Sequence, residues 1–409
     1  MLTNFLVFLG TFLLTLTIQM LVKKNINIMV VTLGVVGLFT ILGLTVANLT
    51  QGDGPRELQM VHIVMRHGIR TPASTYPNDP HINDTLYPVG WGQLTNAGKL
   101  LQYDTGKFLR KRYNDFLGEN YWPEQYYCQS TDVDRTKASV ELTNAGLWPP
   151  SKIQQWGPLD WQPIPVTSQP LDQDDLLLVR VPCAQYHQEL ERVTKSEHVQ
   201  KIYRDNEKLM KELQELTGKQ IKRFDDVQDV YTTLQAEKAF NLTLPKWTKD
   251  YFPEKMQYLS DFSYVITSYN DKLRRLKGGP LLKKILNDWK AKMDGTIEPK
   301  EIRAFLYGGH DYTIANLLGA LKIFDPQTPG YGVAVLLELS KNQENEFVVQ
   351  VFFRNDTSIP PYELTIPGCT KVCPLEKLIE LTKNVIPSNF EAECKSDDPN
   401  YVPPEAGGP

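Results

Sequence analysis

The sequence predicts an α/β protein in which a helical segment interrupts a domain built on a sheet. Residues 58–65 form a mostly apolar run that ends abruptly in the segment RHGIRTP. Residues 302–307 form a second such run, which ends in GGHD. Buried strands of α/β sheets have this near-continuous apolar pattern. Residues 183–293 are instead dense in Lys, Glu, Gln and Leu at helical spacing, which predicts the inserted helical segment.

The first 47 residues differ from the rest because they consist of two apolar stretches, 2–22 and 29–47, separated by a segment with two lysines and no acidic residue. The second stretch has the form of a secretory signal peptide, with the lysines before it and the small residue Ala47 at its end. The first stretch leaves two alternatives open. Either Met20 or Met29 is the true start, or residues 1–47 form an N-terminal membrane anchor with the lysines in the cytosol. Both alternatives deliver the following domain to the lumen or the exterior.

The charge balance argues against a nucleic-acid partner. The chain of 409 residues carries 44 basic and 48 acidic residues, and without its first 47 residues it carries 42 and 48, a net charge of −6. Nucleic-acid binding needs a basic surface. Export is supported by glycosylation sequons at Asn48, Asn83, Asn241 and Asn355.

The turn after the first strand carries the residues best suited to chemistry. Gly68 and Pro72 force a sharp turn there, so Arg66, His67 and Arg70 are presented together at the carboxyl end of a strand. Open α/β sheets bind their ligands at this edge. Two guanidinium groups around one imidazole suit a phosphate or a carboxylate, and the imidazole can also act as a nucleophile.

Two further segments add polar residues at strand ends. His310 and Asp311 follow the strand at 302–307 and open a helix, which makes a second corner that favours anions, with an acid beside it. Arg135 lies in the segment STDVDRT, just after a short apolar run at 125–128 and at the start of a helix predicted over 133–146.

With these three segments, the chain resembles the histidine acid phosphatases. The shared motifs are RHGxRxP, STDVDRT and the late His-Asp pair, in that order, together with WGQLT, WQPIP and PGC. The resemblance covers roughly residues 57–394 and is nearest to the prostatic and lysosomal type and to the acid phosphatases of insect venom. It implies a phosphoglycerate-mutase-like architecture, in which a mixed-sheet α/β domain flanked by helices carries a smaller inserted helical cap.

The resemblance also implies roles for individual residues. His67 is the nucleophile that forms a phosphohistidine, and Asp311 is the proton donor. The substrate phosphate is held by four residues: Arg66, Arg70, Arg135 and His310. Either histidine motif alone would more often be structural, as a salt-bridge partner or a helix cap, but their combination with Arg135 favours the catalytic interpretation. No cofactor and no metal are expected, because the sequence contains no His-Glu-x-x-His, Cys-x-x-Cys or clustered Asp ligand set.

The other four histidines favour structural interpretations. His62 lies inside the first apolar run and is expected to be a packed or hydrogen-bonded core residue. His81 and His198 are expected in a loop and on a helix surface. His187 lies on a cap helix, where contact with substrate is the minor alternative.

The predicted order of elements divides the chain into domains. A long helix is expected over 96–117 with Thr95 as its N-cap, and an ordered linker without regular structure over 149–170. Strands return at 333–339 and 347–354, and the last helix is expected over 375–385. The predicted domains are the α/β domain at 55–170 and 294–394, the helical cap at 171–293, and a polar tail at 395–409 that is expected to be disordered.

Five cysteines in an exported chain suggest two disulfides and one free thiol. Cys369 and Cys373 are close enough in sequence to close a small loop, and the resemblance pairs Cys183 with Cys394. Cys128 is expected to be a buried free thiol inside a strand, with an intermolecular disulfide as the alternative.

Two positions depart from the family's usual residues. Ile69 stands where many of these enzymes have aspartate, and Tyr312 stands where threonine is common, which leaves the substrate preference open. The overall prediction is a secreted acid phosphatase that hydrolyses phosphate monoesters at acidic pH. Lysosomal or membrane-anchored placement, a homodimer, a mutase-like or inositol phosphate-hydrolysing enzyme, and an inactive venom antigen are the alternatives.

Overall fold

The computed structural model describes residues 54–398 and 400–404. The chain divides into two units, Met1–Pro55 and Arg56–Pro409, and the second unit holds the sheet and the helices of the described residues. The two apolar stretches before residue 48, the sequon at Asn48 and the last five residues lie outside the described part, so the signal or anchor prediction stays a prediction. Within the described residues, no helix is both long and apolar enough to cross a bilayer.

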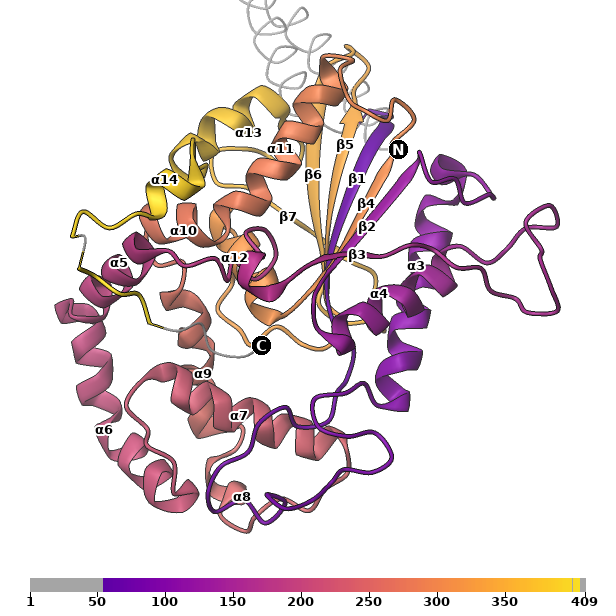
Figure 1. Ribbon diagram of the computed structural model, residues 1–409. Coiled ribbons are helices and arrows are strands. Elements are labelled where there is room, and N and C mark those ends of the chain that lie inside the picture. The colour runs from indigo at the N-terminus through magenta and orange to yellow at the C-terminus, as the bar shows by residue number, and fades with distance from the viewer. Residues whose placement is uncertain (1–53, 399, 405–409) are drawn as a thin grey trace, which may run out of the picture. The chain divides into compact units, whose positions relative to one another are not determined.

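An eight-stranded mixed sheet forms the centre of this unit (Figure 1). Seven strands lie in the order β3-β2-β4-β1-β5-β6-β7, and β8 pairs with β6. The pairs β1–β4, β2–β4 and β2–β3 are parallel, whereas β1–β5, β5–β6, β6–β7 and β6–β8 are antiparallel. The strand bounds are Glu57–Arg66 (β1), Tyr126–Thr131 (β2), Thr167–Gln169 (β3), Ala304–Gly309 (β4), Ala334–Lys341 (β5), Phe347–Arg354 (β6), Tyr362–Leu364 (β7) and Cys373–Pro374 (β8).

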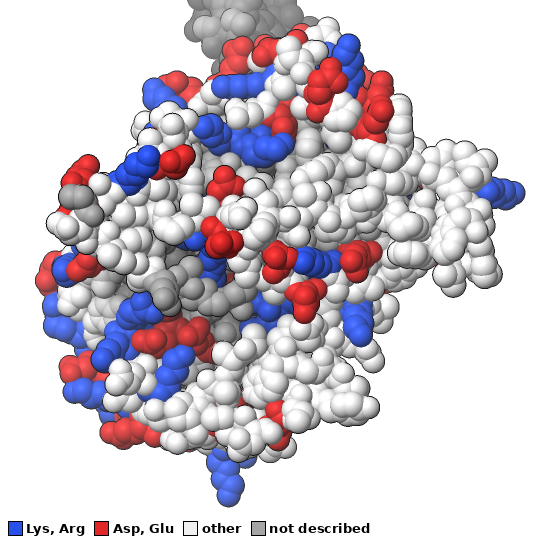
Figure 2. Space-filling view, in the orientation of Figure 1, with Lys and Arg blue, Asp and Glu red and all other residues white. Residues whose placement is uncertain are grey.

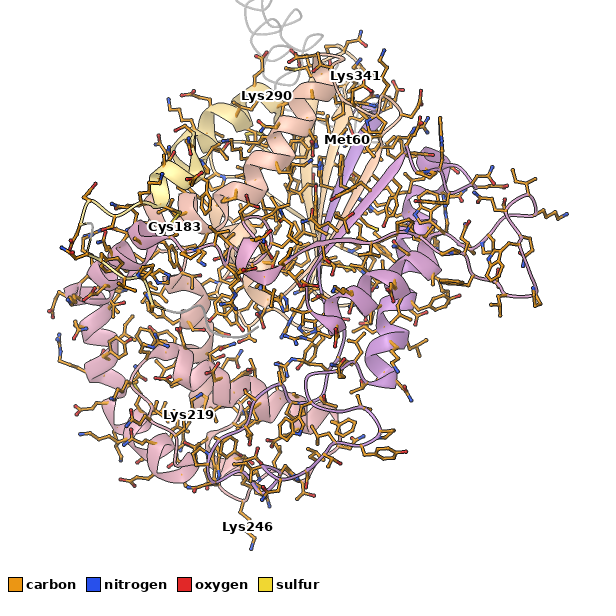
Figure 3. All side chains as sticks on the ribbon, in the orientation of Figure 1. Met60, Cys183, Lys219, Lys246, Lys290 and Lys341 are labelled. Atoms are coloured by element: carbon orange, nitrogen blue, oxygen red, sulfur yellow. A yellow bond between two sulfur atoms is a disulfide. The ribbon has the colours of Figure 1, made fainter. Side chains whose placement is uncertain are left out.

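The alternation of side chains along β1 explains why both faces of the sheet are covered. Val61, Ile63 and Met65 belong to one buried cluster, and Met60 and Val64 belong to another. The first cluster is shared with helices α3 (Asn96–Leu117) and α4 (Asp134–Leu147), and the second with α11 (Gly279–Met293), α12 (Asp311–Ala320) and α13 (Leu375–Thr382). Successive strand residues point to opposite faces, so a strand buried on both sides is mostly apolar. Figure 1 shows these helices on the two sides of the sheet, and Figure 3 shows Met60 within it. The mixed-sheet α/β prediction is confirmed.

Helices α3 and α4 cover one face of the sheet and follow β1 and β2 in the sequence. Helix α3 spans Asn96–Leu117, as predicted, and the Thr95 side chain accepts a hydrogen bond from the backbone N–H of Gly98. This cap satisfies one of the amide groups that a helix start leaves without a partner. Helix α4 spans Asp134–Leu147.

The predicted helical insertion consists of seven helices within residues 171–293, preceded by a 3-10 turn at Leu171–Gln173. Their bounds are Ala184–Thr194 (α5), Glu197–Thr217 (α6), Phe224–Ala239 (α7), Thr248–Tyr251 (α8), Glu254–Ile266 (α9), Asp271–Lys277 (α10) and Gly279–Met293 (α11). Helices α5 to α10 share a separate buried cluster, whereas α11 packs on the sheet. The exact division into domains stays a prediction.

Three expectations about regular structure were wrong in detail. The linker at 149–170 contains the short strand β3, whose residues Thr167–Gln169 pair with the edge of β2. The helix expected over 375–385 is α13, Leu375–Thr382, followed by a 3-10 turn at Lys383–Val385. It is also not the last helix, because α14 spans Phe390–Cys394 and is capped by the Asn389 side chain. Strand pairing creates β3 and side-chain capping supports α14, and the pattern of apolar residues in the sequence indicates neither.

The cysteines join the C-terminal part of the chain to the helical insertion. Cys183 is bonded to Cys394, and Cys369 to Cys373. Figure 3 shows Cys183 at the start of α5. Cys128 is a buried free thiol on β2, and burial raises its pKa to about 11. After Cys394, Gln185 and Gln188 of α5 form hydrogen bonds with Asp397 and Ser396.

Candidate active site

The parallel strands β1, β2 and β4 bring the predicted site residues to one edge of the sheet. In their registers, Arg66 of β1 lies opposite Gly309 of β4, and Ser130 of β2 lies opposite Gly308. The residues that follow these strands are therefore neighbours, although they are far apart in the sequence. The carboxyl ends of the three strands point toward the helical insertion (Figure 1).

Two glycines let the turn after β1 pack directly on the start of α3. A Cβ on Gly68 would lie 2.5 Å from the carbonyl oxygen of Gly98, and a Cβ on Gly98 would lie 2.0 Å from that of Ile69. Neither distance is compatible with a larger residue unless the backbone moves. The Gly68 N–H also donates to the Ser139 hydroxyl at 3.1 Å, which ties the turn to α4.

His67 is buried at this turn and has its tautomer assigned by a backbone contact. Its Nδ1 lies 2.9 Å from the carbonyl oxygen of Gly68. A carbonyl only accepts hydrogen bonds, so Nδ1 carries the proton and Nε2 keeps its lone pair. Burial, followed by the charges of Arg135, Arg66, His310 and Arg70, lowers the pKa of His67 well below its ordinary value.

Three buried arginines surround this imidazole, and we call Arg66, Arg70 and Arg135 the arginine cluster. Arg66 forms an ion pair with Asp311 at 2.7 Å, donates to the Pro329 carbonyl, and lies 4.5 Å from the centre of the Tyr331 ring. Arg70 donates to its neighbouring carbonyl at Thr71 at 2.9 Å.

Arg135 is the second residue of α4 and completes the cluster. Burial, and then the charges of Arg70 and Arg66, lower its pKa to about 10, while Asp311 acts in the opposite direction. The Nε atoms of all three arginines are buried and lack a hydrogen-bond partner within the described part of the chain. Unsatisfied buried donors of this kind favour an anionic ligand.

His310 and Asp311 lie where β4 ends and α12 begins. Helix α12 spans Asp311–Ala320, and His310 and Thr313 form its capping box. The His310 Nε2 lies 2.9 Å from the Thr131 hydroxyl at the end of β2. Burial and the charges of Arg135, Arg66, Arg180 and Arg70 lower the pKa of His310 well below its ordinary value, so its ring is neutral. The two imidazole rings of His67 and His310 are 5.4 Å apart.

The structure therefore brings together all six predicted site residues, from three separate segments of the chain. It also adds residues that the sequence motifs did not indicate. Tyr331 stacks on Arg66 and lies 5.8 Å from the His67 ring, and the Gly332 N–H donates to the His67 carbonyl. Burial, with Asp311 nearby, raises the pKa of Tyr264 on α9. Arg180 acts electrostatically on His310. These contacts depend on the tertiary fold, and no local pattern could have indicated them.

The two unusual residues take different surroundings. The Tyr312 ring lies 4.6 Å from the Tyr264 ring of α9, and its hydroxyl lies 3.5 Å from that of Ser263. Its bulk therefore fills the contact between α12 and the helical insertion. Ile69 is half-buried at the turn.

Three of the remaining histidines, His62, His81 and His198, form their contacts with residues outside the arginine cluster. His62 is fully buried, lies 3.0 Å from Asp288 and stacks on Phe305, which confirms the expectation of a packed core residue. His81 lies in the loop between β1 and α3, and His198 is exposed on α6. Among the described residues, no group of three or more His, Cys, Asp or Glu side chains is arranged to hold a metal ion.

Comparison with known proteins assigns the class. Residues 57–354 match the model of the histidine phosphatase superfamily (branch 2), and the chain belongs to this family. Solved structures share the fold. The phytase of Citrobacter braakii aligns with a TM-score of 0.64 at 19% identity, over 83% of this chain and 99% of that one. The Hafnia alvei phytase in complex with myo-inositol hexakis sulphate also gives 0.64, at 20% identity over 84% and 99%.

Relatives in sequence narrow the class to the acid phosphatases. The chain is 38% identical over 343 residues to venom acid phosphatase Acph-1 of Apis mellifera, covering 83% of this chain and 88% of that protein. It is 39% identical over 348 residues to human prostatic acid phosphatase, with the same coverage. It is 34% identical over 345 residues to rat lysosomal acid phosphatase, covering 83% and 81%. The protein is an acid phosphatase of the histidine phosphatase family, as the sequence motifs predicted.

Proposed function

We propose that this acid phosphatase hydrolyses phosphate monoesters through a covalent phosphohistidine on His67. The observation that carries the proposal is the tautomer of His67. Its Nδ1 is committed to the Gly68 carbonyl at 2.9 Å, and the ring is buried among three arginines. Nε2 is then a lone-pair nucleophile beside a site for an anion.

The arginine cluster and His310 bind the transferred phosphoryl group in this proposal. Buried guanidinium groups hold the phosphate oxygens and neutralise the charge that develops on them. His310 adds a further donor when its Nε2–H exchanges the Thr131 hydroxyl, 2.9 Å away, for a phosphate oxygen. The phosphate takes over Arg66 from Asp311, which releases the Asp311 carboxyl from its ion pair at 2.7 Å. That carboxyl then carries the proton needed by the leaving group.

The reaction proceeds in two displacements. His67 Nε2 attacks phosphorus, the bond from phosphorus to the ester oxygen breaks, and Asp311 gives its proton to that oxygen, so the alcohol departs. Asp311, now a carboxylate, takes a proton from water while the water oxygen attacks phosphorus. The phosphorus–nitrogen bond breaks and inorganic phosphate leaves. Two displacements split one difficult step into two easier ones.

The electrostatics of His67 support activity at acidic pH. Burial and the surrounding positive charges lower its pKa well below 6.5, so the free imidazole persists as the pH falls. A histidine with an ordinary pKa would be protonated, and so not nucleophilic, under the same conditions.

Trapping of the intermediate tests the mechanism. His67→Ala should lose p-nitrophenyl phosphate hydrolysis by at least about 10⁴-fold, because the nucleophile is removed. Rapid acid-free quenching of the wild type with ³²P-labelled substrate should place an acid-labile label on His67. The exposed His198 on α6 supplies the control, since His198→Ala should keep full activity and labelling. Label on a serine, or none on any residue, would contradict the covalent mechanism.

We also propose that the protein is exported and glycosylated. The sequons at Asn83, Asn241 and Asn355 present exposed asparagine side chains, and two disulfides join cysteines of the described unit. Disulfides persist in oxidising compartments. Expression in an insect or mammalian cell line should deliver enzyme to the medium, with mass shifts on glycosidase treatment that Asn→Gln variants remove. Retention in lysosomes or in the membrane fraction would favour the alternative locations.

A homodimer is the remaining partner proposal. The loop before β3 exposes apolar side chains, with Ile153 exposed to 83%, Trp156 to 57% and Trp161 to 42%. This projecting loop carries few charged atoms (Figure 2), and β3 is an edge strand of the sheet. Exposed apolar segments mark interaction surfaces. Light scattering should give twice the chain mass for the wild type and the monomer mass for Trp161→Glu. A monomeric wild type would sink the proposal.

A further inference from the structure

Arg180 lies in a loop that the structure ties firmly to the catalytic helix start. The buried Asp174 side chain accepts backbone N–H groups of Leu176, Leu177 and Leu178 at 2.7 to 3.1 Å, which makes the loop tight. The Leu177 carbonyl accepts a hydrogen bond from the Thr313 hydroxyl at 2.9 Å. That hydroxyl accepts the His310 backbone N–H at 3.1 Å, so the loop and His310 share one partner.

The backbone just before Arg180 is held in a conformation that β-branched residues avoid. Val179 is buried and has a φ of 55°, in the left-handed region. Such a residue persists only where its surroundings impose the conformation, and it is found more often at functional sites. Lys277 at the end of α10 supplies one such contact, because its Nζ donates to the Val179 carbonyl at 2.9 Å.

Arg180 has a guanidinium that forms no salt bridge with the described residues. Its Nε is buried and has no hydrogen-bond partner, and no acidic side chain among the described residues forms a salt bridge with it. Of the three carboxylates in its loop, Asp172, Asp174 and Asp175, the buried Asp174 is already hydrogen-bonded to backbone amides, and none of the three forms a salt bridge with Arg180. Burial lowers the pKa of Arg180 and, together with the charge of Arg180, lowers that of Lys277 to about 8. The charge of Asp174 acts in the opposite direction on both groups, but no carboxylate is paired directly with the Arg180 guanidinium.

We propose that Arg180 binds a second anionic group, a carboxylate or a phosphate, on the leaving-group portion of the substrate. This inference rests on the proposed phosphatase function. The arginine cluster and His310 already account for the transferred phosphoryl group. Arg180 comes from a different element, its charge acts on His310, and it also interacts electrostatically with Tyr312. Its loop is joined to the first turn of α12 through the hydrogen bond between Thr313 and Leu177. A guanidinium there recognises the leaving group, and the enzyme prefers phosphate esters that carry an additional negative charge.

A matched substrate pair tests the proposal. The probes are 4-carboxyphenyl phosphate and its uncharged methyl ester, which differ by one charge at similar size. The wild type should show the higher kcat/KM for the carboxylate. Arg180→Gln should lower the ratio of the two kcat/KM values by about 10- to 100-fold, the size of a lost charge-assisted hydrogen bond. Arg180→Lys should give an intermediate ratio, because it keeps the charge and loses the fork.

Further variants separate recognition from structure. Arg192, an exposed arginine on α5 that pairs with Glu189, is the control, and Arg192→Gln should keep the wild-type ratio. Lys277→Met should lower the ratio less than Arg180→Gln, because Lys277 only positions the loop. A third substrate with a para-phosphonate in place of the carboxylate tests which anion Arg180 prefers. The preferred anion will give the larger ratio of kcat/KM to that of the uncharged methyl ester.

Two outcomes would overturn the proposal. If Arg180→Gln lowers kcat/KM for both substrates by the same factor, Arg180 acts on the transferred phosphate or on folding, and the proposal fails. An unchanged ratio overturns it as well. In both cases the phosphatase mechanism still holds if ³²P label is found on His67 of the wild type. If instead no label is found on His67 but Arg180→Gln still lowers the ratio, the covalent mechanism fails and the proposal for Arg180 stands.

Discussion

The arginine cluster at the sheet edge and a pair of acidic residues at the helical insertion both bury like charges, but they differ in how the repulsion is relieved. The acid pair consists of Asp79, in the loop between β1 and α3, and Glu237 on α7, and both side chains are buried. Burial and then the charge of Asp79 raise the pKa of Glu237 to about 8. A carboxyl group can take up a proton and become neutral.

Guanidinium groups do not have this option at any pH where the protein works. Even with its pKa lowered to about 10, Arg135 stays charged. Asp311 offsets part of the repulsion within the arginine cluster, and the rest persists until a further anion binds. The acid pair instead loses its repulsion as soon as a proton binds. The arginine cluster therefore favours binding of an anionic ligand, and the acid pair makes the stability of the fold depend on pH. Acidic solution is compatible with both, because the lowered pKa of His67 opposes its protonation and the raised pKa of Glu237 favours its neutral form.

Asp311→Asn gives the largest expected effect that bears on this comparison, because Asp311 is the carboxylate paired with Arg66 inside the arginine cluster. If Asp311 is the proton donor, the loss of kcat should reach about 10²- to 10⁴-fold for an alkyl substrate such as glycerol phosphate. It should be much smaller for p-nitrophenyl phosphate, whose leaving group hardly needs a proton. Asp115→Asn, at an exposed position of α3, is the control. Equal losses on the two substrates would leave Asp311 as a counter-ion that only positions Arg66.

Arg135→Gln is expected to have the next largest effect and to move a pH profile. Loss of one phosphate donor should lower kcat/KM by about 10²- to 10³-fold. Burial is the largest cause of the low pKa of His67 and the charge of Arg135 is the next, so the variant should raise that pKa. His67 would then be protonated at a higher pH, and the acidic limb of the kcat/KM profile should shift to higher pH. Lys137→Gln, on the same helix but paired with Asp132 at the surface, should leave the limb in place.

The contrast between the two regions also shows how far the sequence alone could lead. Arg66 and Arg70 of the arginine cluster were predictable because they lie, with His67, at the end of one apolar run, and such runs end at one edge of a parallel sheet. The role of Arg135 followed only from the family resemblance. Helix 96–117 was predictable to the residue, because Thr95 is a strong N-cap and the apolar spacing is regular.

Other features depend on pairings that no local pattern contains. Strand β4 inserts between β1 and β2, although it follows them in the sequence by more than a hundred residues. The charge of Arg180 acts on His310 because the loop that carries Arg180 is hydrogen-bonded, through Leu177, to Thr313 at the start of α12. Glu237 has an ordinary helical surrounding in the sequence, and only the fold places Asp79 against it. The surroundings of both the acid pair and Arg180 therefore depend on contacts between residues far apart in the sequence.

The smallest expected effect concerns stability and tests the other half of the comparison. The Glu237 carboxyl has an ordinary pKa of 4.5, which the unfolded chain would show, and a pKa of about 8 in the folded protein. Between these values the folded state binds more protons than the unfolded state. The contribution of Glu237 is therefore fully present below pH 4.5 and is lost as the pH rises through about 8. The free energy of unfolding should fall by up to about 1.4 kcal/mol for each pH unit in this window.

Glu237→Gln should remove most of this slope, because an amide keeps the shape of the protonated carboxyl and cannot ionise. Urea unfolding at a series of pH values between 5 and 8 measures the slope directly. Glu207→Gln, at an exposed position of α6 paired with Lys211, should unfold with the wild-type slope. His81 is a second contributor to consider, because hydrogen bonds to the Thr243 carbonyl and to Asp84 outweigh burial and raise its pKa. A slope that persists in Glu237→Gln but disappears in His81→Gln would assign the pH sensitivity to the histidine. Both acids of the pair would then stay ionised, as the arginines do. The proposed difference between the two regions, relief of repulsion by proton binding, would be wrong.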